Sequence, residues 1–360
     1  MRIDPDPHDP FGRVINHNNP SRLSFSLNKK IIPMILSSAS QAHLLFCSHL
    51  GLQSDSDLAP LTLREWNPLL RRLQAVDLLP GDLLGWMASD FQTRLGLGEG
   101  EAARLAGLLE RAGALTIALE RLESLGIGAV TRADSAYPQR YRERLKDSAP
   151  CVLFYAGERE LLGQPGIAVV GSRHLDEAGQ ACAAFVGNAC GFSGLVLYSG
   201  GAKGVDTISM RAALEARGTA VGILADSLER AIRVPETRSA LQRGDLCLVT
   251  PNAPNAGFSV GAAMGRNRLI YTLADYAIVV ASDAETGGTW AGASEALKTG
   301  WLPVFVLDHP AMPDGNRLLL QKGALSFPHP FLEHYSKLNE WLKTQAGQVK
   351  TPPKQLGLFS

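Results

Sequence analysis

The sequence predicts an α/β protein whose core is a Rossmann-like, doubly wound and mostly parallel sheet, preceded by a small helical domain. Three observations support this fold class. From residue 166 onward, short apolar strands alternate with helical segments. The run Tyr276–Ser282 is continuously apolar, as expected of a strand covered on both faces. Before residue 131, the apolar residues instead follow helical spacing.

The alternation gives each element of the core an expected position. Strands are expected at 166–171, 194–199, 219–224, 245–250, 276–281 and 303–307. Helices are expected at 176–190, 204–217, 265–275, 289–299 and 316–322. A further short strand, Cys151–Tyr155, is expected in the connector that leads to the core. Because ligands of doubly wound sheets bind beyond the carboxyl ends of the strands, the loops there are the functional candidates.

The chain is expected to have four parts. Residues 1–33 are rich in Pro, Asn, Asp and His without periodicity, which predicts a disordered leader. Residues 38–130 form the helical domain, similar to a sterile-alpha-motif or helix-hairpin-helix domain, and residues 131–330 form the Rossmann-like core. Residues 331–360 are expected to hold the end of a short closing helix, within 325–343, and an extended tail.

The composition confines any polyanion site to a local cluster of cations. The 360 residues carry no formal net charge, so no global field attracts nucleic acid or membrane. The five cysteines are scattered without a CxxC pair, which indicates free thiols in a reducing compartment. No apolar run reaches the roughly 18 residues of a membrane span, and the first residues lack the apolar core of a signal peptide. These features predict a cytoplasmic protein without a membrane partner.

In the helical domain, Leu95–Leu105 has the glycine spacing of a helix-hairpin-helix. Such a hairpin exposes backbone N–H groups at a helix start, where a DNA phosphate can dock. The alternative is a tight turn without a ligand, because Glu99 and Glu101 would repel a phosphate.

The first candidate loop is Gly171-Ser172-Arg173, directly after a predicted strand. Gly171 permits close backbone approach, Ser172 offers a hydroxyl, and Arg173 offers a planar guanidinium for phosphate. Asp176 is expected to cap the following helix. The alternative for Arg173 is a solvated ion pair with Asp176 or Glu177.

The second candidate loop, Ser199–Asp206, surrounds Lys203 with three glycines, Gly200, Gly201 and Gly204. Lys203 precedes a helix expected to begin near Val205, so its ammonium and the helix N–H groups can share one anion. Asp206 is expected to orient loop amides rather than to act as a base. The loop lacks both the GxxxxGK[ST] order of a P-loop and the GxGxxG of a dinucleotide site.

Two further segments are expected at the same edge of the sheet. Gly265–Arg268 contains Arg266, Asn267 and Arg268. Because the two arginines are two positions apart, only one is expected to face a ligand while the other braces a loop or lies at the rim. Trp290, in the Gly-rich segment after strand 276–281, either stacks on a base or packs; packing is favoured.

Together, these loops resemble those of the DprA/Smf DNA-processing family. The motifs are AVVGSR (168–173), SGGAKGVD (199–206), GRNR (265–268) and DGNRLLLQKGA (314–324), with AYPQRYRERLKDSAPCVLFYAG (136–157) as a similar lead-in. The resemblance covers residues 133–327 and extends weakly over 38–130. It implies a Rossmann-like fold that binds single-stranded DNA and helps load a RecA-type recombinase, in a homodimer formed through the core.

Carried over residue by residue, the resemblance assigns phosphate binding to Arg173, Lys203, Arg266 and Arg268. The sequence also departs from the family pattern. Met210 stands where the family has a histidine, and Gly287–Ala293 replaces a Ser-Gly-Ser-Leu-x-Thr-Ala stretch, with Gly287 and Gly292 in place of a serine and the threonine. The residues after 330 are too few for the winged helix that many members carry.

The tail carries a separate candidate motif. Residues 355–359, QLGLF, resemble the short peptide by which bacterial proteins dock on the replication sliding clamp. The expected contact residues are Gln355, Leu356, Leu358 and Phe359. In such a peptide-in-groove mode, the apolar side chains would insert and the glutamine would fix the register.

Two functions follow from these patterns. The first is a non-enzymatic single-stranded DNA-binding protein of natural transformation or recombination. The second is a nucleotide sensor or a nucleoside-phosphate-processing protein, for which Glu295 and Asp206 are the available carboxylates. Neither carboxylate has a convincing partner in the sequence. We therefore predict no catalytic residue, no metal site and no cofactor.

Overall fold

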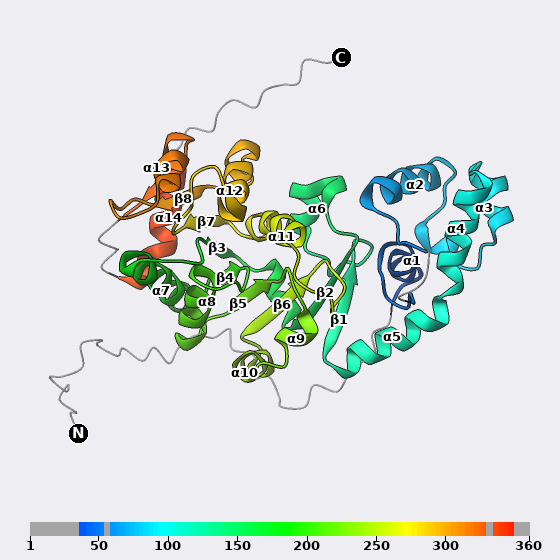
Figure 1. Ribbon diagram of the computed structural model, residues 1–360, viewed down its shortest axis with the longest axis horizontal. Coiled ribbons are helices and arrows are strands. Elements are labelled where there is room, and N and C mark those ends of the chain that lie inside the picture. Colours follow the sequence, from blue (N-terminus) through cyan, green and yellow to red (C-terminus); the bar gives the residue numbers. More distant parts are fainter. Residues whose placement is uncertain (1–35, 54–57, 329–333, 349–360) are drawn as a thin grey trace, which may run out of the picture. The chain divides into compact units, whose positions relative to one another are not determined.

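The computed structural model describes residues 36–53, 58–328 and 334–348. Within them lies one nine-stranded sheet with the order β1-β2-β6-β5-β4-β3-β7-β8-β9 (Figure 1). Strands β3 to β9 pair in parallel, and β2 and β1 are added antiparallel at one edge. The strands are β1 (Ile127–Thr131), β2 (Val152–Gly157), β3 (Gly166–Val170), β4 (Val196–Ser199), β5 (Ala220–Ile223), β6 (Leu246–Thr250), β7 (Tyr276–Val279), β8 (Val304–Leu307) and β9 (Leu325–Phe327).

Helices cover both faces of this sheet, which confirms the predicted fold class. Helices α7 and α8 pack on each other on one face, while α11 and α12 pack on each other on the opposite face (Figure 1). The helices after β1 are α6 (Gln139–Leu145), α7 (Glu177–Ser193), α8 (Val205–Glu215), α9 (Leu228–Ala231), α10 (Pro235–Arg243), α11 (Val260–Leu273), α12 (Gly287–Thr299), α13 (Asp314–Gln321) and α14 (Leu338–Gly347).

The strand order places a switch point between β3 and β7. From β3 the chain proceeds through β4, β5 and β6 in one direction, and β7, β8 and β9 then extend the sheet in the other. Connections leave β3 and β7 toward opposite sides, so their carboxyl ends border a crevice in which doubly wound proteins bind ligands. All residues of β3 and β4 are buried, as expected of central parallel strands.

The core elements agree with the predictions except at a few places. Asp176 caps α7 as predicted, with its carboxylate accepting a hydrogen bond from the Gly179 N–H at 2.8 Å. Helix α11 begins at Val260 rather than at 265, because the Ser259 hydroxyl accepts from Ala262 N–H and caps it earlier. Strands β1 and β9 and helices α6, α9 and α10 were not predicted. Strand β9 occupies the start of the segment expected to be a closing helix, and pairs with β8.

The segment before β1 is helical, as predicted. It contains α1 (Ser38–Cys47), α2 (Leu63–Ala75), α3 (Ala88–Leu95), α4 (Glu99–Glu110) and α5 (Ala112–Ser124). Gly96 ends α3 in the left-handed conformation, with φ 65°, and Gly98 precedes α4. Glu99 and Glu101 occupy the first turn of α4, where their charges oppose phosphate binding. This hairpin therefore fits the tight-turn interpretation better than a phosphate site.

These helices contact the sheet-containing core directly. Helix α1 packs against β1 and β2. Arg121 of α5 donates two hydrogen bonds to the carboxylate of Glu229 in α9, at 2.9 and 2.7 Å. The leader 1–33 and the tail 349–360 lie outside the described residues.

Two negative findings apply to the described part of the chain. None of its helices has the length and apolar character needed to cross a membrane. It also contains no cluster of three or more His, Cys, Asp or Glu residues that could hold a metal ion.

Candidate nucleic-acid interface

The two predicted loops lie side by side at the switch point. The Ser172 N–H donates to the Ala281 carbonyl just beyond β7, at 2.8 Å. The Ser172 carbonyl in turn accepts from the Val205 N–H, at the start of α8, at 3.4 Å. The loops after β3, β4 and β7 are therefore joined through the backbone of one residue, Ser172.

Two glycines permit this close approach. A Cβ atom on Gly204 would lie 2.4 Å from the Ser172 carbonyl oxygen, and Gly204 has a φ of 87°. A Cβ atom on Gly171 would lie 2.4 Å from Cγ2 of Val205. Any other residue at position 204 would strain the backbone and separate the loops.

Buried polar groups hold the second loop from within. Asp206 Oδ2 accepts from the N–H groups of Gly200 at 3.1 Å and Ala202 at 3.3 Å. This confirms the prediction that Asp206 orients loop amides. The Ser199 hydroxyl donates to the Val169 carbonyl at 2.7 Å, which ties the end of β4 to β3. Burial raises the pKa of Asp206.

Arg266 lies beneath this loop. Its side chain is 8% exposed and forms an ion pair with Asp206, with 3.6 Å between Nη1 and Oδ2. Nη1 also donates to the Ile223 carbonyl at 3.1 Å. A Cβ on Gly200 would lie 1.0 Å from Nη1, so the guanidinium fills the space that glycine leaves. Burial lowers the pKa of Arg266. The placement of Arg266 on a phosphate-contacting surface is thus corrected: it braces the loop from inside.

Arg268 lies on a different side of α11. Its guanidinium forms an ion pair with Glu295 of α12 at 3.2 Å and lies 5.9 Å from the Trp301 ring centre. Asn267 faces α12, where a Cβ on Gly288 would lie 2.1 Å from its Nδ2 atom. The structure therefore does not bring Arg268 and Asn267 into the loop cluster, because α11 runs unbroken through both positions.

Arg173 and Lys203 form the exposed rim of the cluster. Both side chains are exposed, and neither forms an ion pair among the described residues. The alternative pairing of Arg173 with Asp176 or Glu177 is absent from that part of the chain. These two cations stand above backbone that Asp206 and Arg266 fix, which is an arrangement suited to binding an anion.

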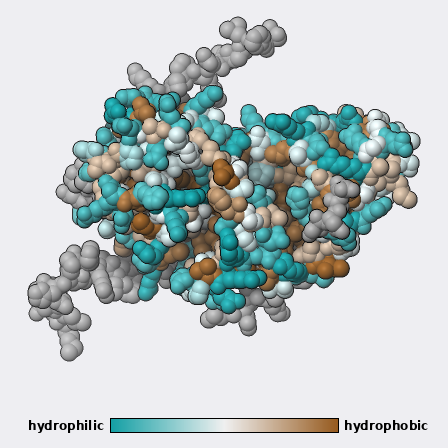
Figure 2. Space-filling view, viewed as in Figure 1, coloured by the Kyte–Doolittle hydropathy of each residue, from teal (hydrophilic) through white to brown (hydrophobic). Residues whose placement is uncertain are grey.

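An exposed apolar group next to Arg173 was missed from the sequence. The Arg173 guanidinium lies 5.8 Å from the ring centre of Phe258. Phe258, Val260 and Met264 are 54%, 72% and 43% exposed. On the face shown in Figure 2, hydrophobic residues form small groups among hydrophilic ones. The sequence did contain a signal for the position of Phe258. This residue directly precedes Ser259, which caps α11, so Phe258 lies just outside the helix.

The motif around DGNR has a structural role. The Asn316 side-chain carbonyl accepts from Ser282 N–H at 2.8 Å, and its amide donates to the carbonyls of Val280 and Leu307 at 2.9 Å each. Asn316 thereby joins the exits of β7 and β8. Trp290 packs against the core, as favoured from the sequence.

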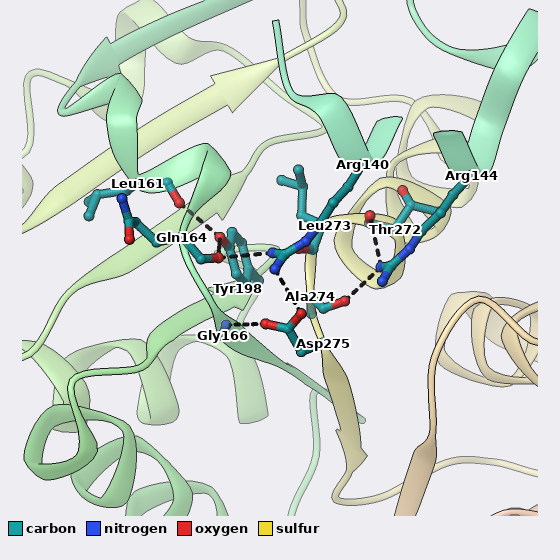
Figure 3. Close-up of polar contacts among 10 residues, drawn as sticks. All are labelled: Arg140, Arg144, Leu161, Gln164, Gly166, Tyr198, Thr272, Leu273, Ala274 and Asp275. Carbon is teal, nitrogen blue, oxygen red and sulfur yellow. Dashed lines mark hydrogen bonds and ion pairs between the residues drawn. The ribbon is translucent and has the colours of Figure 1, made fainter. Parts of the chain in front are cut away.

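The arginines of the lead-in segment hold the far end of α11 (Figure 3). Arg144 of α6 donates to the carbonyls of Thr272 and Ala274, at 3.1 and 2.6 Å. Arg140 donates to the Leu273 carbonyl and to Asp275, whose other oxygen accepts from Gly166 N–H at the start of β3. This network fixes α11 relative to β3, and therefore fixes Arg266 relative to the loops. Sequence reasoning did not assign these roles to Arg140 and Arg144.

The two carboxylates considered for catalysis, Asp206 and Glu295, both interact with other groups of the protein. Asp206 is buried against the loop amides, and Glu295 is paired with Arg268. Met210, at the position of the family histidine, is buried next to β5. The arrangement can bind an anion, but it places no free carboxylate or imidazole from these positions beside the rim.

The chain is similar in sequence to proteins of one known family. The family model described as DNA recombination-mediator protein A matches residues 128–333. The DNA processing protein DprA of Streptococcus pneumoniae (strain ATCC BAA-255 / R6) is 30% identical over 198 residues, which are 53% of this chain and 67% of that protein.

A solved structure of a streptococcal protein shows the same fold. The X-ray structure of DprA from Streptococcus pneumoniae matches with a TM-score of 0.58 and 24% identity, over 81% of this chain and 95% of that chain. A structure of DNA processing protein A from Helicobacter pylori, titled for its single-stranded DNA binding mode, matches with a TM-score of 0.49 and 24% identity, over 61% and 97% of the two chains. The match of the family model over more than half of the sequence, together with the streptococcal relative, shows that the chain belongs to the DNA recombination-mediator protein A family.

Proposed function

We propose that this protein binds single-stranded DNA through the loops after β3 and β4 and processes it for recombination. The observation that carries the proposal is the pair of exposed cations, Arg173 and Lys203, on two loops joined at the switch point. A bound strand would place successive phosphates against the two cations. Phe258, next to Arg173, offers a ring on which a base can stack, which is the usual combination in single-strand binding.

The rigid backbone beneath the cations supports the same function. Because Asp206 and Arg266 neutralise each other inside the protein, they contribute little net charge at the rim. Binding then depends on Arg173, Lys203 and the exposed loop amides. A chain with no net charge can bind a polyanion only through such a local cluster.

A binding titration tests the proposal. Fluorescence anisotropy of a labelled dT oligomer would be measured at two salt concentrations for the wild type and for Arg173→Ala/Lys203→Ala. Each phosphate contact to a single strand contributes about 0.7 to the slope of log K against log salt, so the double variant is expected to lose about 1.4. Affinity should fall alike for all sequences, because the lost contacts are to phosphate.

The matched control is Arg211→Ala/Arg243→Ala. It removes two exposed arginines of α8 and α10, each beyond the middle of its helix and away from the strand carboxyl ends. This variant should keep the salt slope of the wild type. An unchanged slope in the Arg173→Ala/Lys203→Ala variant would contradict the proposed site.

The same titration addresses the alternative of a nucleotide-binding protein. A labelled mononucleotide has a single phosphate group and no neighbouring phosphates for a second cation. The proposal therefore expects it to bind much more weakly than the oligomer. Tight mononucleotide binding without a preference for the oligomer would favour the nucleotide sensor or nucleoside-phosphate-processing protein instead. Asp206 accepts hydrogen bonds from loop amides and Glu295 is paired with Arg268, which supports a protein that acts without catalysis.

The wider roles of the protein rest on family membership. We propose that it acts in the cytoplasm as a homodimer and assists loading of a RecA-type recombinase onto the bound strand. Light scattering of the purified protein tests the dimer. Recombinase filament assembly on coated single strands tests the loading, and an unchanged assembly rate would contradict it.

The clamp motif at Gln355, Leu356, Leu358 and Phe359 lies outside the described residues. Docking of this tail on a sliding clamp stays a proposal from the sequence alone. Deletion of 355–360 is expected to abolish clamp binding and spare DNA binding. Equal recovery of the clamp by the full-length and shortened proteins would rule this out.

A further inference from the structure

Two cysteines that are distant in the sequence meet where the N-terminal helices contact the sheet. Cys47 is the last residue of α1, and Cys151 directly precedes β2. Helix α1 packs against β2, and the Cys47 thiol is hydrogen-bonded to the sulfur of Cys151. Both residues are free thiols. The fold therefore brings together two sulfur atoms that a disulfide could join.

Arg132, which follows β1, holds its positive charge against this pair. Its backbone N–H donates to the Cys151 carbonyl at 3.0 Å, and its guanidinium donates to Cys151 Sγ at 3.4 Å. The guanidinium also donates to the neutral side-chain carbonyl of Asn67 at 2.8 Å. It forms no ion pair with a carboxylate in the part of the chain that the structure describes.

These contacts give the two thiols different acidities. The hydrogen bonds from Cys47 and Arg132 lower the pKa of the Cys151 thiol. Burial raises the pKa of the Cys47 thiol, so Cys47 keeps the proton that it donates to Cys151. A cysteine next to an arginine charge is typical of reactive thiols, because the thiolate is the form that attacks an oxidant.

Small molecules can reach the pair through a cavity of about 340 Å³. Cys47 lines this cavity and is half-buried, and Cys151 is 7% exposed. Ser48 and Val152, the neighbours of the two cysteines along the chain, line the same cavity. One water molecule occupies about 30 Å³ in the liquid, so the cavity has ample room for hydrogen peroxide, which has only one more oxygen atom.

The other three cysteines have different surroundings. Cys182, Cys190 and Cys247 have no exposed surface. Burial raises the pKa of each of these thiols, that of Cys190 to about 12. A buried thiol that keeps its proton is inert toward oxidants. Oxidation is therefore expected at one pair among the five cysteines.

We propose that Cys47 and Cys151 form a reversible redox pair, which a peroxide converts to a disulfide that ties α1 to the start of β2. Disulfides of cytoplasmic proteins are usually transient and redox-sensing, which fits a pair that is reduced at rest. The inference goes beyond the proposed DNA binding and does not depend on it, because Arg173 and Lys203 take no part in this chemistry.

The reaction uses only the two cysteines and the peroxide. The proton of Cys47 passes along the hydrogen bond to the Cys151 sulfur, which leaves a thiolate at the cavity. This thiolate attacks one peroxide oxygen, the O–O bond breaks, and a sulfenic acid and a hydroxide ion form. The Cys151 sulfur then attacks the Cys47 sulfur, and its proton leaves with the sulfenic oxygen as water. Two sulfurs lose two electrons to the peroxide, and a dithiol reverses the step by exchange.

The disulfide is expected to stabilise the fold. It would close a loop of about 100 residues, which restricts the unfolded chain more than a short loop does. For a chain of this size, we expect the midpoint of thermal unfolding to rise by about 5 °C on oxidation. The affinity for a dT oligomer should stay unchanged, because the rim is not altered.

The test treats the full-length protein with hydrogen peroxide and follows its intact mass, its peptide map and its thermal unfolding. The wild type should lose two hydrogen atoms, yield a linked peptide pair with Cys47 and Cys151, and unfold at a higher temperature. Dithiothreitol should reverse all three changes. Cys47→Ser and Cys151→Ser should each prevent the link and the rise in unfolding temperature. The matched control Cys182→Ala should form the link as the wild type does.

The role of Arg132 is tested by the rate of oxidation. Arg132→Met removes the hydrogen bond and the charge next to the sulfur, and should slow formation of the link by about three- to tenfold. The control is Arg71→Met, which removes an exposed arginine that binds Asp147 instead of a sulfur, and it should react like the wild type. Equal rates for Arg132→Met and the wild type would overturn the assignment of Arg132 as the activating group.

The wild type alone can contradict the redox pair. If the peroxide oxidises the folded protein without linking Cys47 to Cys151, the pair is wrong. Links between two molecules, or links to Cys182, Cys190 or Cys247, would overturn it as well. A Cys47–Cys151 link that forms only after unfolding in urea would show that the folded structure does not favour the reaction, and would also rule out the proposal.

Discussion

The rim of the loop cluster and the layer of α11 beneath it both carry cations, but the cations have different surroundings. At the rim, Arg173 and Lys203 are exposed and have no carboxylate partner among the described residues. One layer below, Arg266 is enclosed by Asp206, the Ile223 carbonyl and Gly200. A cation at the rim can exchange water for phosphate, whereas a cation in the layer below can only hold protein groups in place.

Other arginines of this chain belong with Arg266 rather than with Arg173. Arg140 and Arg144 bind carbonyls at the end of α11, and Arg111 binds the Leu45 and Ser48 carbonyls at the end of α1. In each case a guanidinium satisfies carbonyl groups that a helix end leaves without partners. A basic residue in a family motif can therefore either contact a ligand or brace the protein's own backbone, and the groups that it binds decide which.

The largest expected effect comes from breaking the buried pair. Arg266→Ala would leave Asp206 charged and buried without its partner, which destabilises a protein by about 3–5 kcal/mol. Urea unfolding followed by circular dichroism measures this change. DNA binding should weaken as well, although Arg266 does not reach the rim, because the loop amides lose their support.

The double variant Asp206→Asn/Arg266→Met is the control for this prediction. It removes both charges and keeps an acceptor for the loop amides, so it should be more stable than Arg266→Ala. Equal instability of the two variants would show that the ion pair is not what holds the loop.

A smaller effect is expected from crowding the same guanidinium. Gly200→Ala places a Cβ 1.0 Å from the present position of Arg266 Nη1, so the guanidinium must move away from Asp206. We expect a loss of about 1–3 kcal/mol, the range for overpacking a core. Thermal unfolding and the dT titration together measure it.

Gly265→Ala, one residue before Arg266, is the matched control. Gly265 lies inside α11 with open space around its Cβ position, so alanine should stabilise the helix by about 0.5–1 kcal/mol. If Gly200→Ala and Gly265→Ala both destabilise the protein, then α11 and its neighbours do not tolerate alanine in general. The result would then no longer distinguish the layer beneath the loops from the rim.

The sequence predicted the rim better than the layer beneath it. Glycines, an apolar strand and a following helix are local signals, and they placed Arg173 and Lys203 correctly on loops at the strand ends. The burial of Arg266 depends on where α11 crosses β4 and β5, which no local pattern encodes. The start of α11 at Val260 was a missed local signal, since Ser259 is a good cap.

Edge elements escaped prediction for a similar reason. Strands β1 and β9 have five and three residues, and only their pairing with β2 and β8 makes them strands. The non-local parts of the site are therefore those that the sequence did not predict.

The smallest expected effect concerns Arg121, which forms an ion pair with Glu229 at the surface. Its bidentate bond lowers the pKa of the Glu229 carboxyl in the folded protein. A carboxyl with a lowered pKa stabilises the fold above its unfolded pKa of about 4.3, and this contribution disappears as the pH falls through the folded pKa. Because Arg121 is 57% exposed, we expect Arg121→Met to destabilise the protein by only about 1 kcal/mol at pH 7.

The pH dependence of the stability difference distinguishes this ion pair from a packing contact. The stability difference between wild type and Arg121→Met, measured by urea unfolding, should be constant from pH 7 to 5 and then shrink toward zero as Glu229 is protonated in both proteins. Arg211→Met, which removes an exposed pair with Glu215, should change stability by less than about 0.5 kcal/mol at any of these pH values. A difference for Arg121→Met that persists at low pH would mean that its methylenes, rather than its charge, hold α5 against α9.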